Sequence, residues 1–495
     1  MTESSKTSIA VGAAAVLTLA AIFVRPEPPG TPPNAEIGKD MFADFTEPLD
    51  AKSLEVVRYD EDLASVQQFK VAEVNGMWSI PSHYGYPADA ENQMRDAATI
   101  VTDLEILGIA TELVNEHSLF GVVAPDPDSI EAQEGVGTLI TVQDEKGKDL
   151  ARLIVGKKVR GNEDQRFVRR ASQDRVYVVK IDPDKLSTKF EDWIETDLLE
   201  INTFDIKEIL IKDYSVQTTA TFPPRISYNE RMHMRLALEN SSDWKLEELL
   251  EDRGGELSPT ELLSDEELNN ERLREAKDAF DDLQIVDVER KPPGLTKDLR
   301  AESSFVEDNE NLNSLMQRGF YPVDLQQDGQ LDLLCNDGEV LVRTDDGVEY
   351  VLRFGQISAS LEGGEDAGAL NRYLFVMARL WEDKFPELAD EAADKADGET
   401  NHDESDDAAE DASTEEERER DEQLEKLKTA REKVSAMNDR FANWYYIISE
   451  DVFKKIHLGR SDVIKTKEDS KEGFDVSTFR QLEEELKEKE DENDE

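Results

Sequence analysis

The sequence has 495 residues, of which 38% are hydrophobic, and this length and composition are enough for two or three folded domains. It carries 113 acidic residues against 57 Lys and Arg residues, a formal net charge of −56. Such a surface repels nucleic-acid phosphates and anionic lipid headgroups, so we predict no nucleic-acid partner. The single cysteine, Cys335, excludes a disulfide within the chain, and the apolar run before it predicts that it is buried.

The first apolar segment lies close to the N-terminus. Residues 1–7 form a polar stub, and residues 8–24 are apolar apart from Ser8 and Thr18. A helix of this length reaches roughly 26 Å, close to the hydrocarbon thickness of a bilayer. We therefore predict one transmembrane helix over residues 8–24, which makes the chain a single-pass protein of the inner (cytoplasmic) membrane with its bulk outside the cytoplasm. A cleaved signal peptide is the alternative, because Thr18-Leu19-Ala20 offers a small-residue cleavage site.

A proline-rich stretch follows this segment. Residues 25–34 contain prolines at positions 26, 28, 29, 32 and 33. Proline keeps the backbone extended, so residues 25–40 are expected to form a stiff linker that lifts the folded part off the membrane.

The first folded module is predicted over residues 41–204. Residues 69–80 show two alternating apolar runs separated by Asn75-Gly76, the sequence that a two-residue hairpin turn favours. The next apolar positions recur every three or four residues, which predicts one face of an amphipathic helix that ends near residue 103. These positions are Met94, Ala97, Ala98, Val101 and Leu104.

The same plan returns in the second half of the chain. The matching segments are residues 52–58 with 207–212, the strand of Trp78 with that of Trp244, residues 103–106 with 282–285, residues 138–155 with 340–354, residues 166–168 with 372–376, and residues 176–179 with 444–448. The second helix has its apolar positions at Leu268, Leu273, Ala276, Ala279, Phe280 and Leu283. The sequence therefore predicts an α+β protein with tandem duplicated modules of antiparallel strands and hairpins, each with one main amphipathic helix, after one N-terminal transmembrane helix.

The second module, residues 205–480, contains an insertion at about residues 381–440. Acidic residues far outnumber Lys and Arg in residues 387–422, so we expect this part to be disordered. From about residue 414 to 438 the mixture of Glu, Lys, Arg, Leu and Ala favours a solvated helix with the composition of a coiled coil. Residues 481–495 form an acidic tail.

Motifs that carry chemistry do not emerge from the sequence. The histidines, His83, His117, His233, His402 and His457, lack the spacing of metal ligands. Asp126-Pro127-Asp128 and Asp345-Asp346-Gly347 lack the later ligands of a calcium loop and are interpreted as turns. The aromatic residues Trp78, Trp193, Trp244, Trp444, Tyr445 and Tyr446 are assigned to the core. We therefore predict no catalytic, cofactor-binding or metal-binding residue, no cofactor, and no enzymatic activity.

Five short motifs carry a family resemblance. They are Trp78-Ser79-Ile80, Pro87-Ala88-Asp89-Ala90, Asp103-Leu104, Phe120-Gly121-Val122 and Tyr177-Val178-Val179. With the single N-terminal membrane segment, they resemble the bacterial domain-of-unknown-function family 4340, chiefly over residues 41–213. The resemblance implies an extracytoplasmic, membrane-tethered accessory protein, similar to those encoded beside ABC-type and gliding-motility transporters.

The leading hypothesis is therefore a membrane-anchored scaffold or auxiliary subunit that binds an envelope or ABC-type transporter protein. Two other hypotheses stay open. One is a hydrolase that acts on envelope polymers through carboxylates. The other is an acidic spacer that binds cations.

Overall fold

The computed structural model describes residues 36–60, 65–126, 134–183, 186–218, 226–240, 243–296, 299–302, 305, 308–324, 330–358, 370–385 and 415–467. The chain divides into two compact units, Met1–Ile194 and Glu195–Glu495. The predicted stub, transmembrane helix (8–24) and acidic tail (481–495) lie outside the described residues, as does most of the linker. Within the described ranges, no helix combines the length and the apolar character that crossing a membrane requires.

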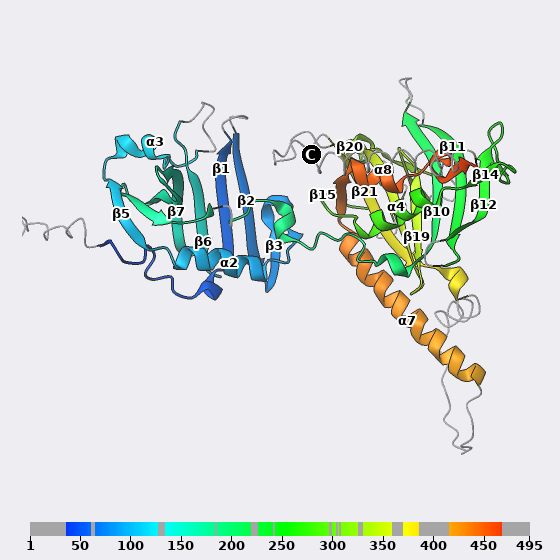
Figure 1. Ribbon diagram of the computed structural model, residues 1–495, viewed down its shortest axis with the longest axis horizontal. Helices are drawn as coiled ribbons and strands as arrows, with labels where there is room; N and C mark the ends of the chain where they lie inside the picture. The colour runs from blue at the N-terminus through cyan, green and yellow to red at the C-terminus, as the bar shows by residue number, and fades with distance from the viewer. Residues whose placement is uncertain are drawn as a thin grey trace, which may run out of the picture. The chain divides into compact units, whose positions relative to one another are not determined.

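The first unit is built on one nine-stranded antiparallel sheet (Figure 1). Its strand order is β4-β3-β2-β1-β6-β7-β8-β9-β5. The elements are β1 (Ser53–Asp60), β2 (Ser65–Val74), β3 (Met77–Ile80), β4 (Tyr86–Pro87), α2 (Glu91–Thr102), β5 (Ile106–Thr111), α3 (His117–Phe120), β6 (Thr138–Gln143), β7 (Asp149–Val159), β8 (Asn162–Arg170) and β9 (Val176–Lys180). Strand β5 therefore lies at one edge of the sheet beside β9, which comes much later in the chain.

Local patterns in the sequence account for the start of this unit. Asn75 and Gly76 adopt φ of 55° and 79°, which is the conformation that the predicted hairpin turn between β2 and β3 requires. The predicted helix is α2, and its buried residues are Met94, Ala97, Ala98 and Val101. The predicted apolar stripe is thus confirmed, and Leu104, just beyond the helix, is fully buried as well.

The second unit contains a second nine-stranded antiparallel sheet, of order β13-β12-β11-β10-β19-β20-β21-β22-β15. Its strands are β10 (Ile206–Thr218), β11 (Ile226–Leu238), β12 (Trp244–Asp252), β13 (Leu257–Pro259), β15 (Asp287–Arg290), β19 (Glu339–Thr344), β20 (Val348–Ser358), β21 (Asn371–Leu380) and β22 (Trp444–Ser449). The helices around it are α4 (Asn270–Asp281), α7 (Glu415–Phe441), α8 (Glu450–Ile456) and α9 (Arg460–Val463), and β14 (Glu266–Leu268) pairs with β23 (Ile464–Thr466).

The two sheets agree strand by strand. In both, the first strand of the unit is the fourth from one edge, the main helix leads into the strand at the other edge, and the last two strands of the main series lie beside that edge strand. Trp78 in β3 and Trp244 in β12 occupy corresponding strands. The buried face of α4 contains Leu273, Ala276, Ala279 and Phe280, as predicted, whereas Leu268 lies ahead of the helix in β14.

In both units a segment of backbone also crosses closely over one strand of the sheet. A Cβ atom on Gly156 of β7 would lie 2.4 Å from the carbonyl oxygen of Phe120, and a Cβ atom on Gly355 of β20 would lie 2.2 Å from that of Arg318. Side chains are excluded at both places because the crossing backbone occupies their space. In each unit the crossing chain then turns at a glycine of positive φ, Gly121 (71°) or Gly319 (85°).

The second unit differs from the first by a small inserted sheet. Between β15 and β19 the chain forms β16 (Arg300–Glu302), α5 (Asn309–Gln317), β17 (Phe320–Val323) and β18 (Gln330–Cys335), with strand order β16-β18-β17. This insertion packs its apolar residues on Leu341, Val351 and Phe375 of the large sheet. The sequence patterns had not predicted it.

Under the insertion, one row of neighbouring side chains in the second sheet is apolar, whereas a row on the corresponding strands of the first sheet is polar. Leu210, Leu341 and Val351 are direct cross-strand neighbours in the second unit. Glu55, Thr141 and Arg152 are cross-strand neighbours on the corresponding strands of the first unit. The apolar row thus suits the cover that the insertion provides, whereas on the same face of the first sheet Leu139 and Ile154, next to the polar row, belong to a separate apolar cluster.

Helix α7 stands where the first unit has a tight turn between β8 and β9. It begins at Glu415, close to the predicted start at about residue 414. The prediction of disorder over residues 387–422 is wrong for residues 415–422, because these Glu and Arg residues are strong helix formers and continue into the helix. Residues 387–414 lie outside the described part. Figure 1 shows α7 extending from the sheet of the second unit.

Candidate functional site

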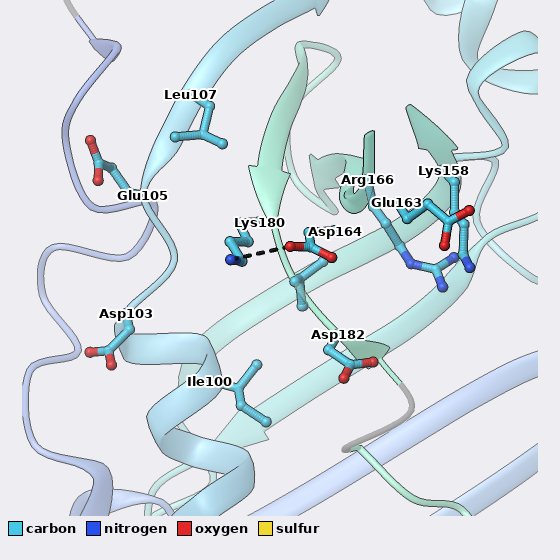
Figure 2. Close-up of a pocket in the computed structure, with 11 residues that line it drawn as sticks. Ile100, Asp103, Glu105, Leu107, Lys158, Glu163, Asp164, Arg166, Lys180 and Asp182 are labelled. Carbon is cyan, nitrogen blue, oxygen red and sulfur yellow. Dashed lines mark ion pairs between the residues drawn. The ribbon is translucent and has the colours of Figure 1, made fainter. Parts of the chain in front are cut away.

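The first unit contains a hollow at the end of its sheet where β8, β9 and β5 are neighbours (Figure 2). Its volume is about 670 Å³. Eleven residues line it: Ile100, Asp103, Glu105, Leu107, Lys158, Glu163, Asp164, Arg166, Lys180, Ile181 and Asp182. We call it the charged hollow.

Four parts of the fold meet in the charged hollow. Ile100 and Asp103 come from the end of α2, and Leu107 comes from β5. The hairpin between β7 and β8 supplies lysine, arginine and carboxylate side chains, and the end of β9 supplies Lys180. Because these residues are spread along the sequence and follow no spacing rule, no motif marked them in advance.

The lining is dominated by exposed charge. All its carboxylates, those of Asp103, Glu105, Glu163, Asp164 and Asp182, are exposed. Figure 2 shows the ion pair between Lys180 Nζ and Asp164 Oδ2, at 3.3 Å, and both side chains are more than two-thirds exposed. An exposed pair of this kind contributes at most about 1 kcal/mol. The hollow therefore suits recognition of a charged, hydrated surface better than enclosure of a small apolar ligand.

Most of the buried charged residues lie in the second unit, where two rows of charged residues cross the strands. In the first row, Glu339 of β19 lies between Lys212 of β10 and Arg353 of β20. Lys212 Nζ lies 2.6 Å from Glu339 Oε1, and Arg353 Nε lies 2.9 Å from Glu339 Oε2. Burial alone would raise the pKa of Glu339, but Arg353 and Lys212 outweigh it and lower the pKa to about 2.

The second row crosses four strands. Glu208, Arg343, Glu349 and Arg379 are consecutive cross-strand neighbours on β10, β19, β20 and β21. Arg343 Nη1 lies 2.8 Å from Glu208 Oε2, and Arg343 Nε lies 2.6 Å from Glu349 Oε2. Arg379 pairs with the other oxygen of Glu349. Opposite charges thus alternate across the sheet, which fixes the strand register.

Cys335 is fully buried, as predicted. Its Sγ lies 3.1 Å from the Tyr214 hydroxyl and donates to the Gly338 carbonyl oxygen at 2.9 Å. Burial raises the pKa of the Cys335 thiol to about 12, so the residue is a protonated thiol at neutral pH. A buried thiol in this state is a packing group and not a nucleophile.

The other residues considered in the sequence have structural contacts. His83 stacks on Phe190, His117 Nε2 lies 2.7 Å from the Asp174 carbonyl oxygen, His233 pairs with Glu230, and His457 stacks on Phe453. His402 lies outside the described residues. Asp346 in the β19–β20 turn receives a hydrogen bond from Lys433 at 2.6 Å. Among residues that the structure describes, no three His, Cys, Asp or Glu side chains form a group that could hold a metal ion.

Five of the six aromatic residues assigned to the core are found there. Trp193, Trp244, Trp444, Tyr445 and Tyr446 are buried. Trp78 is half-buried in β3.

Comparison with known proteins gives one match. Residues 78–302 match the family described as Domain of unknown function (DUF4340). The match begins in β3 and ends in β16, so it starts later and extends further than the expected residues 41–213. No curated protein and no solved structure matches the chain.

Proposed function

Because this chain belongs to the DUF4340 family, whose description assigns no activity, we propose a role from its own architecture. We propose a membrane-anchored extracytoplasmic scaffold or auxiliary subunit of an ABC-type transport or envelope complex, without catalysis. The observation that carries the proposal is the presence of two nine-stranded sheets with the same strand order behind a predicted membrane anchor. Two rigid platforms on one tether suit the binding of another envelope protein.

We also propose that the two units are tandem duplicates. Chance agreement in the order of nine strands is small, and the glycine crossings at Gly156 and Gly355 add a second, independent likeness. A duplicated module that keeps its sheet and changes its loops provides two different binding surfaces from one fold.

The charge distribution favours a binding role. The buried ionisable groups of the two rows pair with one another across the sheet, where they specify register. In the part of the chain that the structure describes, the charged hollow is a candidate place for the hydrolase alternative, and its carboxylates are exposed to water. A carboxyl group that acts as a general acid usually needs a drier environment than this.

The first test concerns the anchor. The full-length chain should stay in the membrane pellet after extraction at high salt and alkaline pH. A matched chain in which a cleavable export signal replaces residues 1–24 should move to the soluble fraction. Release of the full-length chain under the same conditions would refute the anchor.

The second test concerns the partner. A full-length chain with a C-terminal tag, purified from its own membranes in mild detergent after brief crosslinking, should bring down a polytopic permease and its ATPase subunit in fixed proportion. The chain without its anchor should lose them. Recovery of the full-length chain alone, with or without crosslinking, would contradict the scaffold role.

A further inference from the structure

Strand β21 extends beyond its neighbour. Strand β22 pairs with it only from Asn371 to Leu374, opposite Ser449 to Tyr446. Residues 375–380 continue to pair with β20 on their other side, up to Leu380 opposite Val348. These six residues therefore form a strand edge that no strand of the described chain covers.

Helix α7 covers this edge. The Ala378 N–H donates to Asn438 Oδ1 at 2.8 Å, and Asn438 Nδ2 donates to the Ala378 carbonyl oxygen at 2.7 Å. The side-chain amide of Asn438 thus makes the two bonds that a residue of a neighbouring strand would make. Leu427 and Ala430 of the helix are buried against Phe385 and Leu380.

The edge has the composition that strand pairing favours. Of residues 375–380, only Arg379 is charged and none is proline. Natural sheets usually protect an edge with charges, prolines, bulges or a covering element, and here the protection depends on the helix. The first unit has no such overhang, because β9 begins opposite the next-to-last residue of β8, Arg169. The overhang is therefore not needed to build this fold.

The cover is held at a few points, and part of the helix projects beyond them. Residues 418 and 420–426 are exposed, and Leu424 is 43% exposed. Other polar attachments of the helix are the hydrogen bond from Lys433 to Asp346 and, near the end of the helix, those from Arg440 to Glu200 and to the Asp197 carbonyl oxygen. A helix attached this way can be displaced by a ligand that makes the same contacts.

We propose that residues 375–380 of β21 are a binding edge for an extended segment of a partner protein, and that α7 covers this edge until the partner replaces it. The incoming strand would bond to the Ala378 backbone in place of Asn438 and place apolar side chains in the space of Leu427 and Ala430. Arg379 is half exposed and pairs with Glu349, so an acidic residue of the partner beside Arg379 would extend the charged row.

The test uses the full-length chain and a synthetic peptide of alternating Val and Thr residues that contains one Glu. A control peptide, the proline twin, has the same sequence interrupted by proline. Leu427→Ala and Asn438→Ala loosen the cover, and Leu424→Ala is the matched control on the exposed part of the helix. We expect amide exchange at residues 375–380 to speed up about tenfold in the first two variants and the peptide to bind about tenfold more tightly, with the control like the wild type. Bound peptide should restore protection of these amides, and the proline twin should not.

Several outcomes would overturn the proposal. Unchanged exchange in Leu427→Ala and Asn438→Ala would show that α7 is not the cover. Faster exchange without peptide binding would show that α7 is permanent protection of the edge. Dimers of the loosened variants, seen by sedimentation without peptide, would make a second copy of the chain the occupant. The proposal rests on the scaffold role only for the source of the partner segment, and co-purification with a permease tests that role separately.

Discussion

Replacing Glu339 by Gln should strongly destabilise the second unit. Glu339 is 7% exposed and is the carboxylate between Lys212 and Arg353. A neutral amide in its place leaves the Arg353 guanidinium buried without its counter-charge. Removing one partner of a buried ion pair costs about 3 to 5 kcal/mol.

The pKa of Glu339 gives a second, separate argument for the size of this loss of stability. A fall from the ordinary 4.5 to about 2 corresponds to about 3 kcal/mol in favour of the ionised carboxylate in the folded unit. Because the folded pKa lies below the unfolded one, this contribution is fully present above about pH 4.5 and is lost as the pH falls toward about 2. The two arguments agree.

Urea unfolding at neutral pH measures the loss. Trp244, Trp381 and Trp444 lie in the second unit, and their fluorescence follows its transition. Glu208→Gln is the matched control, because Arg343 keeps Glu349 when Glu208 is neutralised, and it should cost only about 1 kcal/mol. A loss below about 1 kcal/mol for Glu339→Gln, or equal losses in the two variants, would refute the reasoning.

Three further predictions concern other parts of the chain. Burial lowers the pKa of His457 below 6.5, so the unfolded chain binds the proton more tightly and the second unit should lose stability as the pH falls below about 6.5. The melting temperatures at about pH 7.5 and 5.5 should therefore differ less in His457→Phe than in the wild type, and an unchanged difference would exclude this histidine as the cause. Gly156→Ala and Gly355→Ala should each lower the free energy of unfolding in urea by about 3 kcal/mol or more, because their Cβ atoms would meet the crossing backbone. Gly108→Ala is the control, since its Cβ atom would lie 3.9 Å from the nearest neighbour, and it should cost about 1 kcal/mol or less; equal losses would contradict the crossing. Replacing residues 387–414 by a short Gly/Ser linker should leave the melting temperature, measured by calorimetry, nearly unchanged or slightly higher, because the entropy of loop closure depends weakly on length and like charges are removed. A loss of about 3 kcal/mol or more in the free energy of unfolding would show that this stretch supports the fold.

Features with a local cause could be predicted from the sequence. Asn75-Gly76 predicts its turn because few other residue pairs adopt positive φ twice without strain, and the spacing from Met94 to Val101 predicts α2 because it places apolar groups on one face. The order of such features in both halves was enough to align β1 with β10 and β3 with β12.

Features that depend on distant partners could not be predicted. Lys212, Glu339 and Arg353 are ordinary charged residues until strand register places them side by side, and no rule of spacing along the chain gives that register. The strands of the inserted sheet are short, and runs such as residues 331–334, which are apolar except for Asp332, fit a helix as well as a strand. The charged hollow escaped prediction for the same reason, because its lining comes from five separate elements, α2, β5, β7, β8 and β9.

The position of the edge strands also sets the order in which the chain can fold during synthesis. Ile106 of β5 pairs with Val179 of β9, so the first sheet can close once the ribosome has released that hairpin. Asp287 of β15 must wait for Ile447 of β22, which follows the inserted sheet and α7. Closing so long a loop costs more entropy and slows pairing. The N-terminal half can thus be complete while the C-terminal half still exposes an unfinished sheet. Folding of the C-terminal half would then be the slow step that export or chaperone machinery encounters.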